Sequence, residues 1–314
     1  MGKLVNGKWH NIWYDTESNK GEFVREDASF RNCLGNNRFP IEKDRYHLYV
    51  SYACPWAHRT LIFRKLKKLD QIISYSAVKP LMMENGWELD ADSPGPEPLK
   101  YLYEVYCRTQ SDYTGRVTVP VLWDKKNKEI VCNESSEIIR MFNTVFNDLT
   151  GENTDYYPEA LKNEIDEINT FIYNNINNGV YRAGFATTQE VYNSAVHSLF
   201  KALDEIEARL SRQDYLIANT LTEADWRLFT TLIRFDSVYY GHFKCNIRSI
   251  ESYPNLSKYI KKLYNFPSIK ETVRFDQIKQ HYYESHTSIN PTQIVPVGPQ
   301  IEYEISEKQK EKIT

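Results

Sequence analysis

A cysteine directly before a proline has the local setting in this chain that most favours chemistry. Cys54 follows the alternating apolar residues of 47–50, and apolar residues at helical spacing follow Pro55 as far as Leu69. Proline suits the first turn of a helix, because the N–H that it lacks would have no partner there. Cys54 is therefore predicted at the positive end of a helix dipole, where a thiolate is favoured. We interpret it as a nucleophile; the alternative is a buried structural cysteine.

No second cysteine lies one helical turn beyond Cys54, because position 57 is alanine. A disulfide formed at Cys54 would therefore need a thiol from another molecule, such as glutathione, to resolve it. The remaining cysteines are scattered, with no C-x-x-C pair and no zinc-type cluster, so no metal site is predicted. They are Cys33, Cys107, Cys132 and Cys245.

Two segments suit the groups that glutathione presents, which are two carboxylates, an amine and peptide amides. An extended edge at Val119-Pro120 could pair with the cysteinyl amide groups of glutathione. Unpaired amides at a helix start near Glu134-Ser135 suit its γ-glutamyl carboxylate, and the Glu134 carboxylate suits its ammonium. Taken alone, Glu134-Ser135 is better explained as a simple helix cap.

The elements that must position these residues alternate between strand and helix up to about residue 150. The predicted elements are a strand (47–50), a helix (55–69), a strand (72–78), two further strands (116–124 and 129–132) and a helix (138–142). This order is typical of a thioredoxin-like α/β domain. The prolines of residues 79–116 predict a long surface insertion. At Val119-Pro120, a proline inside a β segment of this fold order suggests a cis peptide bond.

The second half of the chain is predicted to be all-helical. Apolar residues recur there at helical spacing, and no strand-like run occurs in 155–275. Thr222 and Asp225 predict a helix start with a capping box, in which aspartate replaces the usual glutamate. After Asp276 the chain is polar and aromatic, and its prolines argue against a helix.

Three segments of the chain follow from these patterns. Residues 1–46 show no period and are expected to form an extended arm packed on a later domain. The α/β domain is predicted over 47–150 and the all-helical domain, with an extended tail, over 151–314.

The totals exclude several classes of protein. A length of 314 residues allows two domains, and the net charge of −3 argues against a nucleic-acid binder. No apolar run approaches the ~20 residues of a membrane helix, and the N-terminus lacks a secretory or transit pattern. We therefore expect a cytoplasmic protein with no membrane or nucleic-acid partner.

In their joint order, several segments resemble the omega-like glutathione transferases. These are Ala-Cys54-Pro-Trp-Ala-His-Arg-Thr, Val119-Pro120-Val-Leu-Trp-Asp, Glu134-Ser135 and the Leu-Thr-Glu-Ala-Asp225 helix start. Further segments are similar to the Xi class, the glutathionyl-hydroquinone reductases. They are Gly86-Trp87, Gly179-Val-Tyr181-Arg-Ala-Gly-Phe-Ala and His281-Tyr-Tyr-x-Ser-His-x-x-Ile-Asn-Pro. The resemblance spans roughly residues 5 to 300.

The resemblance implies a thioredoxin-like domain, then an all-α C-terminal glutathione-transferase domain, usually in a homodimer. By resemblance, Cys54 matches the catalytic cysteine and Trp87 the tryptophan that covers glutathione. The main chain of Val119, before Pro120, would pair with the glutathione backbone, and Glu134 with Ser135 would hold its γ-glutamyl group.

Tyr181 and Tyr282 match tyrosines near an aromatic substrate, with Tyr283 leaving a one-residue ambiguity. The implied activity is glutathione-dependent reduction of S-glutathionyl-hydroquinones through a mixed disulfide on Cys54. One alternative is a broader omega-type thiol transferase acting on dehydroascorbate or small mixed disulfides. The other is a non-catalytic module that binds glutathione.

Overall fold

The computed structural model describes residues 2–306 and divides the chain into two compact units. One unit holds the residues up to Trp13 together with Glu26–Asp155. The other holds Tyr14–Arg25 together with the residues from Tyr156 onward. Of the first 46 residues, only Tyr14–Arg25 belong to the second unit.

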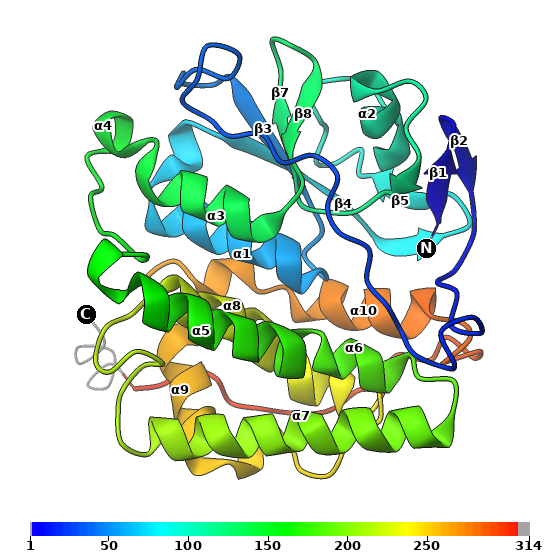
Figure 1. Cartoon of the computed structure of the whole chain (residues 1–314), viewed down its shortest axis with the longest axis vertical. Helices are drawn as coiled ribbons and strands as arrows, with labels where there is room; N and C mark the ends of the chain where they lie inside the picture. Colours follow the sequence, from blue (N-terminus) through cyan, green and yellow to red (C-terminus); the bar gives the residue numbers. More distant parts are fainter. Residues whose placement is uncertain (1, 307–314) are drawn as a thin grey trace. The chain divides into compact units, whose positions relative to one another are not determined.

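A five-stranded sheet organises the first unit (Figure 1). Its strand order is β5-β4-β3-β7-β8, and β3 is the central strand. The strands are β3 (Tyr46–Val50), β4 (Ser74–Met83), β5 (Gly86–Leu89), β7 (Val121–Asp124) and β8 (Glu129–Cys132). The β3 strand runs parallel to β4, the helix α1 (Pro55–Leu66) joins them, and β7 pairs antiparallel to β3. This is the predicted thioredoxin-like order.

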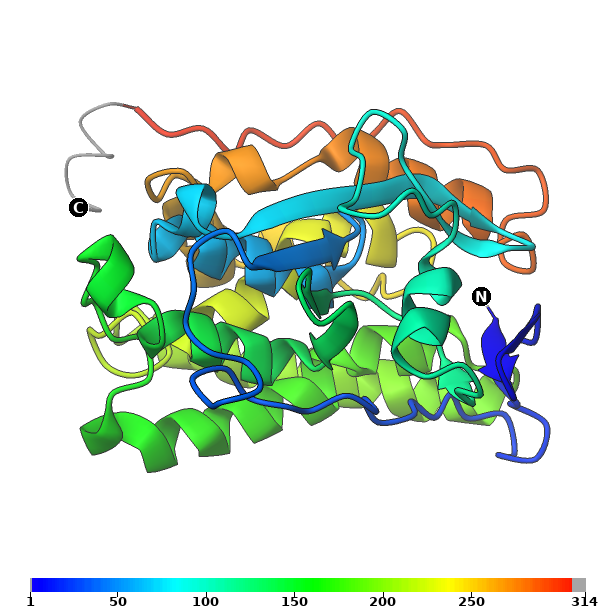
Figure 2. The same ribbon diagram turned by 90° about the horizontal axis from the view of Figure 1, so that it is seen from above.

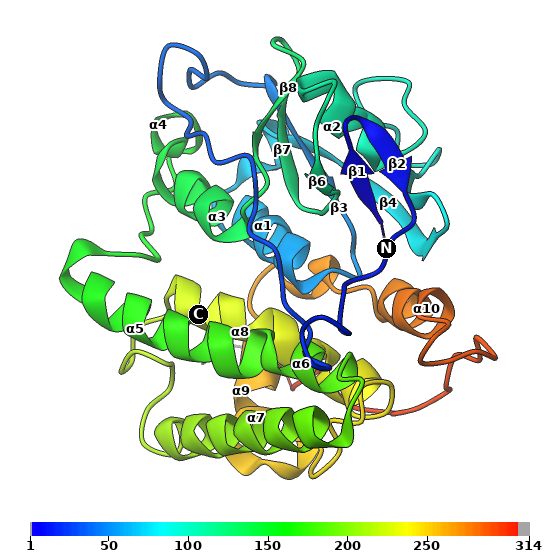
Figure 3. The same ribbon diagram turned by 45° about the vertical axis from the view of Figure 1, so that its right-hand side comes forward.

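Helices cover both faces of this sheet. Figure 3 shows α1 and α3 (Ser135–Thr144) together on one side of the sheet and α2 (Leu102–Thr109) on the other. All five residues of β3 are buried, as expected for a strand that is covered on both faces. The short helix α4 (Asn147–Thr150) follows α3.

A small second sheet contains two strands from the N-terminal residues, for which no strand was predicted. The strand β1 (Lys3–Val5) pairs with β2 (Lys8–His10) and with β6 (Gly115–Arg116). Asn6 and Gly7 connect β1 and β2, and both have positive φ angles, of 47° and 72°. Asn-Gly with positive φ at both positions is the favoured two-residue hairpin loop.

Two predictions about secondary structure were wrong. Residues 79–116 are not one long loop: β4 continues to Met83, β5 follows, and α2 begins at Leu102 (Figure 2). Leu102, Val105 and Tyr106 are buried at helical spacing, whereas the prolines lie mostly at 94–98. Residues after 275 do form a helix, α10 (Phe275–Ser285), because the prolines of that region begin only at position 291.

The second unit is helical, and between residues 156 and 306 it contains no strand. Its α-helices are α5 (Lys162–Ile172), α6 (Gly179–Gly184), α7 (Gln189–Leu210), α8 (Glu223–Arg234), α9 (Pro254–Tyr264) and α10. Two π-helical turns follow α5 and α8, over Tyr173–Asn177 and Phe235–Tyr239. The predicted capping box starts α8: Asp225 accepts a hydrogen bond from the Thr222 amide at 2.8 Å. No helix in residues 2–306 has the length and apolar character needed to cross a membrane.

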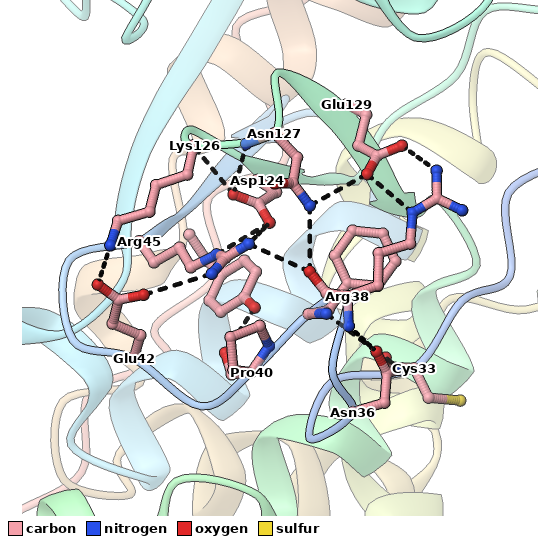
Figure 4. A network of polar contacts seen from close by, with 12 residues as sticks. Cys33, Asn36, Arg38, Pro40, Glu42, Arg45, Asp124, Lys126, Asn127 and Glu129 are labelled. Atoms are coloured by element: carbon pink, nitrogen blue, oxygen red, sulfur yellow. Dashed lines mark hydrogen bonds and ion pairs between the residues drawn. The ribbon is translucent and has the colours of Figure 1, made fainter.

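A buried ion pair fastens the loop before β3 to the turn between β7 and β8 (Figure 4). The Arg45 guanidinium donates to Asp124 Oδ2 from Nε at 2.9 Å and from Nη2 at 2.6 Å, and neither side chain is exposed. Arg38 pairs with Glu129 nearby, and the Arg38 carbonyl accepts from Arg45 Nη2 at 3.1 Å. Because both side chains are buried, removing one of them would leave the charge of the other buried without this partner.

Candidate active site

Cys54 occupies the predicted position at the start of α1. It is the N-cap residue, with φ −78° and ψ 120°, and Pro55 is the first helical residue. A turn places it there, since the Cys54 amide donates to the Ser51 carbonyl at 3.1 Å. The first turn of α1 contains no acidic residue, so no carboxylate there offsets the positive end of the helix. Cys54 is a partly exposed residue, as is typical of reactive cysteines.

The Val119-Pro120 segment lies beside this sulfur. Cys54 Sγ is 3.6 Å from the Val119 carbonyl oxygen, and the Val119-Pro120 peptide bond is cis, as expected from the fold order. Val119 precedes β7 and is not one of the residues that β7 pairs with β3. Val119 lies in a bend just before β7, and its carbonyl faces the thiol.

The start of α3 is tied to α1 through Arg59. Arg59 Nη1 donates to Ser135 Oγ at 3.3 Å, and its guanidinium lies 4.4 Å from the centre of the Trp56 ring. Arg59 and Ser135 are both buried. Since Arg59 is only five residues after Cys54, this bond holds the beginning of α3 near the beginning of α1.

Glu134 has the role of a helix cap. Its Oε1 accepts hydrogen bonds from the Ser136 amide at 2.9 Å and from Ser136 Oγ at 2.8 Å. The simpler interpretation of this residue, capping, is therefore correct, but it occupies only one of the two carboxylate oxygens. Glu134 Oε2 and the N-terminus of α3 lie on the same short segment. This segment therefore offers both a carboxylate oxygen and the amides of a helix start.

Trp87 is placed apart from these groups. It lies on β5 at the edge of the sheet, where β4 and β3 separate β5 from β7. Three strand spacings of ~4.8 Å put β5 about 14 Å from β7. Cys54 thus contacts Val119, and Arg59 connects α1 to Ser135, whereas Trp87 lies on the strand at the opposite edge of the sheet from β8.

Three of the other cysteines are held in their neutral form. Burial raises the pKa of the Cys107, Cys132 and Cys245 thiols, and for Cys132 the nearby Glu137 carboxylate acts in the same direction. Cys33 is exposed but lies in a loop, away from any helix start. No group of three or more His, Cys, Asp or Glu side chains in the described chain could hold a metal ion.

A second group of candidate residues lies in the helical unit. Tyr181 on α6 and Tyr282 on α10 are both buried, and their hydroxyl oxygens are 2.5 Å apart. Burial raises the pKa of Tyr282 well above its usual value, so its hydroxyl keeps its proton at neutral pH. Tyr283, the other candidate, points elsewhere: its hydroxyl lies 3.5 Å from the Ser237 carbonyl. The structure thus groups Tyr282, and not Tyr283, with Tyr181.

The sequence analysis missed a third tyrosine of this group. The Tyr239 hydroxyl lies 3.3 Å from that of Tyr282, and burial raises the pKa of Tyr239 well above its usual value. Tyr239 ends the π-helical turn Phe235–Tyr239, and such turns are frequent at functional sites. The signal available in the sequence was only a tyrosine pair after the α8 pattern.

Two histidines, also missed, pack against the tyrosines. His242 Nε2 and His286 Nδ1 are 3.1 Å apart, and both imidazoles are buried. The ring of Tyr282 stands edge-on to both of them, with centroids 6.4 Å and 5.4 Å away. Burial lowers the pKa of His242 to about 4 and that of His286 well below its usual value, so both rings stay neutral.

Family models match a segment of each unit of the chain. The family described as "Glutathione S-transferase, N-terminal domain" matches residues 53–145, and "Glutathione S-transferase, C-terminal domain" matches residues 189–262. The chain is 54% identical to glutathionyl-hydroquinone reductase YqjG of Escherichia coli K12 over 313 residues, which cover 95% of each chain.

Solved structures give the same result for the fold. The glutathione-bound structure of YqjG from Escherichia coli K-12 superposes with a TM-score of 0.89 at 50% identity, covering 97% of each chain. The Xi class glutathione transferase from Natrialba magadii superposes with a TM-score of 0.90 at 45% identity. That alignment covers 99% of this chain and 97% of the Natrialba chain.

The buried histidine pair predicts that the folded protein becomes less stable as the pH is lowered. The folded state holds these rings neutral, whereas the unfolded chain takes up protons below about pH 6.5, so protonation favours unfolding. Between pH 6.5 and 5, one histidine with a folded pKa of about 4 lowers the free energy of unfolding by about 1.6 kcal/mol. We expect His242→Gln to flatten the decline of the urea midpoint between pH 7 and 5. The exposed His197 provides the control, since His197→Gln should leave the decline as in the unaltered protein. An unchanged decline in His242→Gln would contradict the assignment.

Proposed function

Since this chain belongs to the glutathione transferase family, in its Xi class of glutathionyl-hydroquinone reductases, we propose that it reduces S-glutathionyl-hydroquinones with glutathione. The observation that carries the proposal is the position of Cys54. Its sulfur lies at the N-terminus of α1, whose first turn contains no acidic residue, and is 3.6 Å from the Val119 carbonyl oxygen. Position 57 is alanine, so no second cysteine follows one turn later. That arrangement suits a single thiolate that exchanges with glutathione.

In the first half-reaction the Cys54 thiolate attacks the glutathionyl sulfur of the substrate. A Cys54–glutathione disulfide forms as the bond from sulfur to the ring carbon breaks, and the electron pair of that bond passes to the ring. The ring carbon then takes up one proton. The hydroquinone is thereby reduced by two electrons, and Cys54 is oxidised to the mixed disulfide.

Tyr181 and Tyr282 are proposed to hydrogen-bond the quinol oxygens and to supply the proton that the ring carbon takes up. The 2.5 Å contact between their hydroxyls supports this role, because it gives one proton a short path between two phenols.

In the second half-reaction the thiolate of another glutathione attacks the glutathionyl sulfur of the mixed disulfide. Oxidised glutathione leaves, and the Cys54 thiolate is restored. Two half-reactions on the same sulfur predict ping-pong kinetics.

Glutathione is proposed to bind along the first unit. Val119, before the cis Pro120, would pair through its main chain with the cysteinyl amide groups, in the manner of an added strand. The start of α3 at Ser135 would hold the γ-glutamyl carboxylate, and the uncapped oxygen of Glu134 the ammonium. Trp87 would cover the bound tripeptide.

Two further proposals rest on the family resemblance and on the chemistry of the thiol. One is a cytoplasmic location, because the cycle consumes reduced glutathione, which a reducing compartment supplies. The other is a homodimer, for which light scattering should give about twice the chain mass of 37.0 kDa. A mass of one chain would contradict the dimer without affecting the chemistry.

Replacing Cys54 tests the nucleophile. Cys54→Ser should abolish the release of hydroquinone, because serine cannot form the mixed disulfide. Mass spectrometry after incubation with oxidised glutathione should find one glutathione on Cys54 of the unaltered protein. Cys33→Ser, which removes the exposed thiol outside the site, is the matched control and should retain both adduct and activity. Hydroquinone release by Cys54→Ser would refute the mechanism, and a protein that binds glutathione without forming the adduct would be a non-catalytic module.

Replacing the tyrosines separates quinol reduction from general thiol transfer. Tyr181→Phe and Tyr282→Phe should each lower kcat/KM for a glutathionyl-hydroquinone by about 100-fold, as expected for loss of a proton donor. Reduction of dehydroascorbate or of a small mixed disulfide by the same variants should change by less than about threefold, because sulfur exchange needs no proton on carbon. Tyr283→Phe is the matched control, since the Tyr283 hydroxyl lies outside the group. Full quinol activity in both variants would instead favour the broader omega-type thiol transferase.

A further inference from the structure

Three aromatic rings from two segments, β2 and the start of α2, form one stack on the first unit. Trp9 on β2 stacks on Tyr103 of α2, with centroids 5.2 Å apart and planes at 19°. Tyr103 stacks in turn on Tyr101, at 5.2 Å and 15°. The Lys100 ammonium lies 5.1 Å from the centre of the Tyr101 ring. Such parallel stacking fixes the orientation of the Trp9 indole relative to α2.

The Trp9 indole also contacts the turn between β4 and β5. Its Nε1–H donates to the Glu84 carbonyl at 2.9 Å. A Cβ built on Gly86 would lie only 2.6 Å from Cη2 of Trp9, so at position 86 only glycine leaves room for the indole. The positive φ of Gly86, 71°, is a second reason for glycine there. Trp9 thus contacts the β4–β5 turn at Glu84 and again at Gly86.

Trp87 is the next residue of this strand. The hairpin pairs Met83 with Gly86 and Met82 with Trp87. Because successive residues of a strand point to opposite faces, Gly86 presents its Cα to Trp9 and Trp87 points to the other face. Trp9 therefore packs against one face of β5, and the Trp87 side chain lies on the opposite face.

The β5 strand is held by few contacts of its own sheet. It has four residues and lies at the edge of the sheet, where short strands open most easily. Its far end is held by the hydrogen bond from the Leu89 amide to the Lys100 carbonyl, at 2.8 Å, and by the bridge between Glu88 and Tyr101. Its near end, which carries Trp87, is held by β4 and by Trp9.

We propose that Trp9 is a positioning residue for glutathione binding: it holds the β4–β5 turn so that Trp87 is already ordered when glutathione arrives. The inference rests on the proposed role of Trp87 in covering glutathione. A turn that had to be ordered on binding would weaken affinity, since only the ordered fraction of the protein is competent to bind. The effect belongs to binding and not to the chemical steps at Cys54.

Glutathione binding by the Cys54→Ser protein, measured by calorimetry, tests the inference without any turnover. Trp9→Ala should raise the Kd for glutathione about tenfold. Trp9→Phe keeps a ring in the stack but loses the hydrogen bond to Glu84, and should raise it about threefold. In proteins that retain Cys54, Trp9→Ala should raise KM for glutathione and leave kcat at saturating glutathione within about twofold. Ile12→Ala, at an exposed apolar residue three positions after Trp9, is the control and should change neither value.

A double-mutant cycle separates positioning from a general loss of stability. In a Trp87→Ala background, Trp9→Ala should have almost no further effect on the Kd, because the residue that it positions is gone. An equal tenfold effect in both backgrounds would overturn the inference, and so would a Trp87→Ala variant that binds glutathione normally. If Trp9→Ala does not fold, Trp9→Phe carries the same cycle. A protein that shows the cycle but reduces no hydroquinone would refute the proposed function and still support the inference.

Discussion

The position of the reactive sulfur depends on how the central strand of the sheet ends. All five residues of β3 are buried, since α1 and α3 cover one face of the sheet and α2 the other. A buried strand must leave the sheet through a turn that satisfies its backbone, and here Ser51 accepts the Cys54 amide in that turn. The parallel pairing of β3 with β4 then requires a crossover, which is α1. Cys54 lies at the point where strand geometry changes to helix geometry, so its chemistry follows from the topology of the sheet.

The tyrosine group of the helical unit depends on desolvation. Tyr181, Tyr239 and Tyr282 come from three different helical segments and meet through their hydroxyls. Burial makes the phenols of Tyr239 and Tyr282 hold their protons more tightly. A buried hydroxyl must also find a hydrogen-bond partner, and these tyrosines bond to one another. The neutral histidine pair beside them adds no charge that would disturb the group.

Sequence patterns predicted the order of elements, the position of Cys54 and the start of α8, because each depends on local chemistry. Proline at a first helical position and a capping box act within a few residues, so they can be recognised without a fold. The sequence patterns did not predict α2 and α10. In both cases we gave the prolines of neighbouring segments more weight than a short apolar pattern. Tyr239 and the histidine pair lay beyond prediction for another reason: only tertiary packing brings residues 181, 239, 242, 282 and 286 together. The ring stack at Trp9 likewise joins residues about 90 positions apart in the chain.

The division of the chain has a consequence for how the protein is connected. The backbone passes from the first unit to the second after Trp13, returns after Arg25 and leaves again after Asp155. Three covalent links therefore join the two units, and neither unit is a single continuous stretch of sequence. One proteolytic cut after Asp155 would make residues 156–314 a separate fragment, whereas residues 14–25 of the same unit would stay covalently joined to the first unit at both ends. Exchange of either half between relatives at one crossover point would separate this segment from the unit that it packs against.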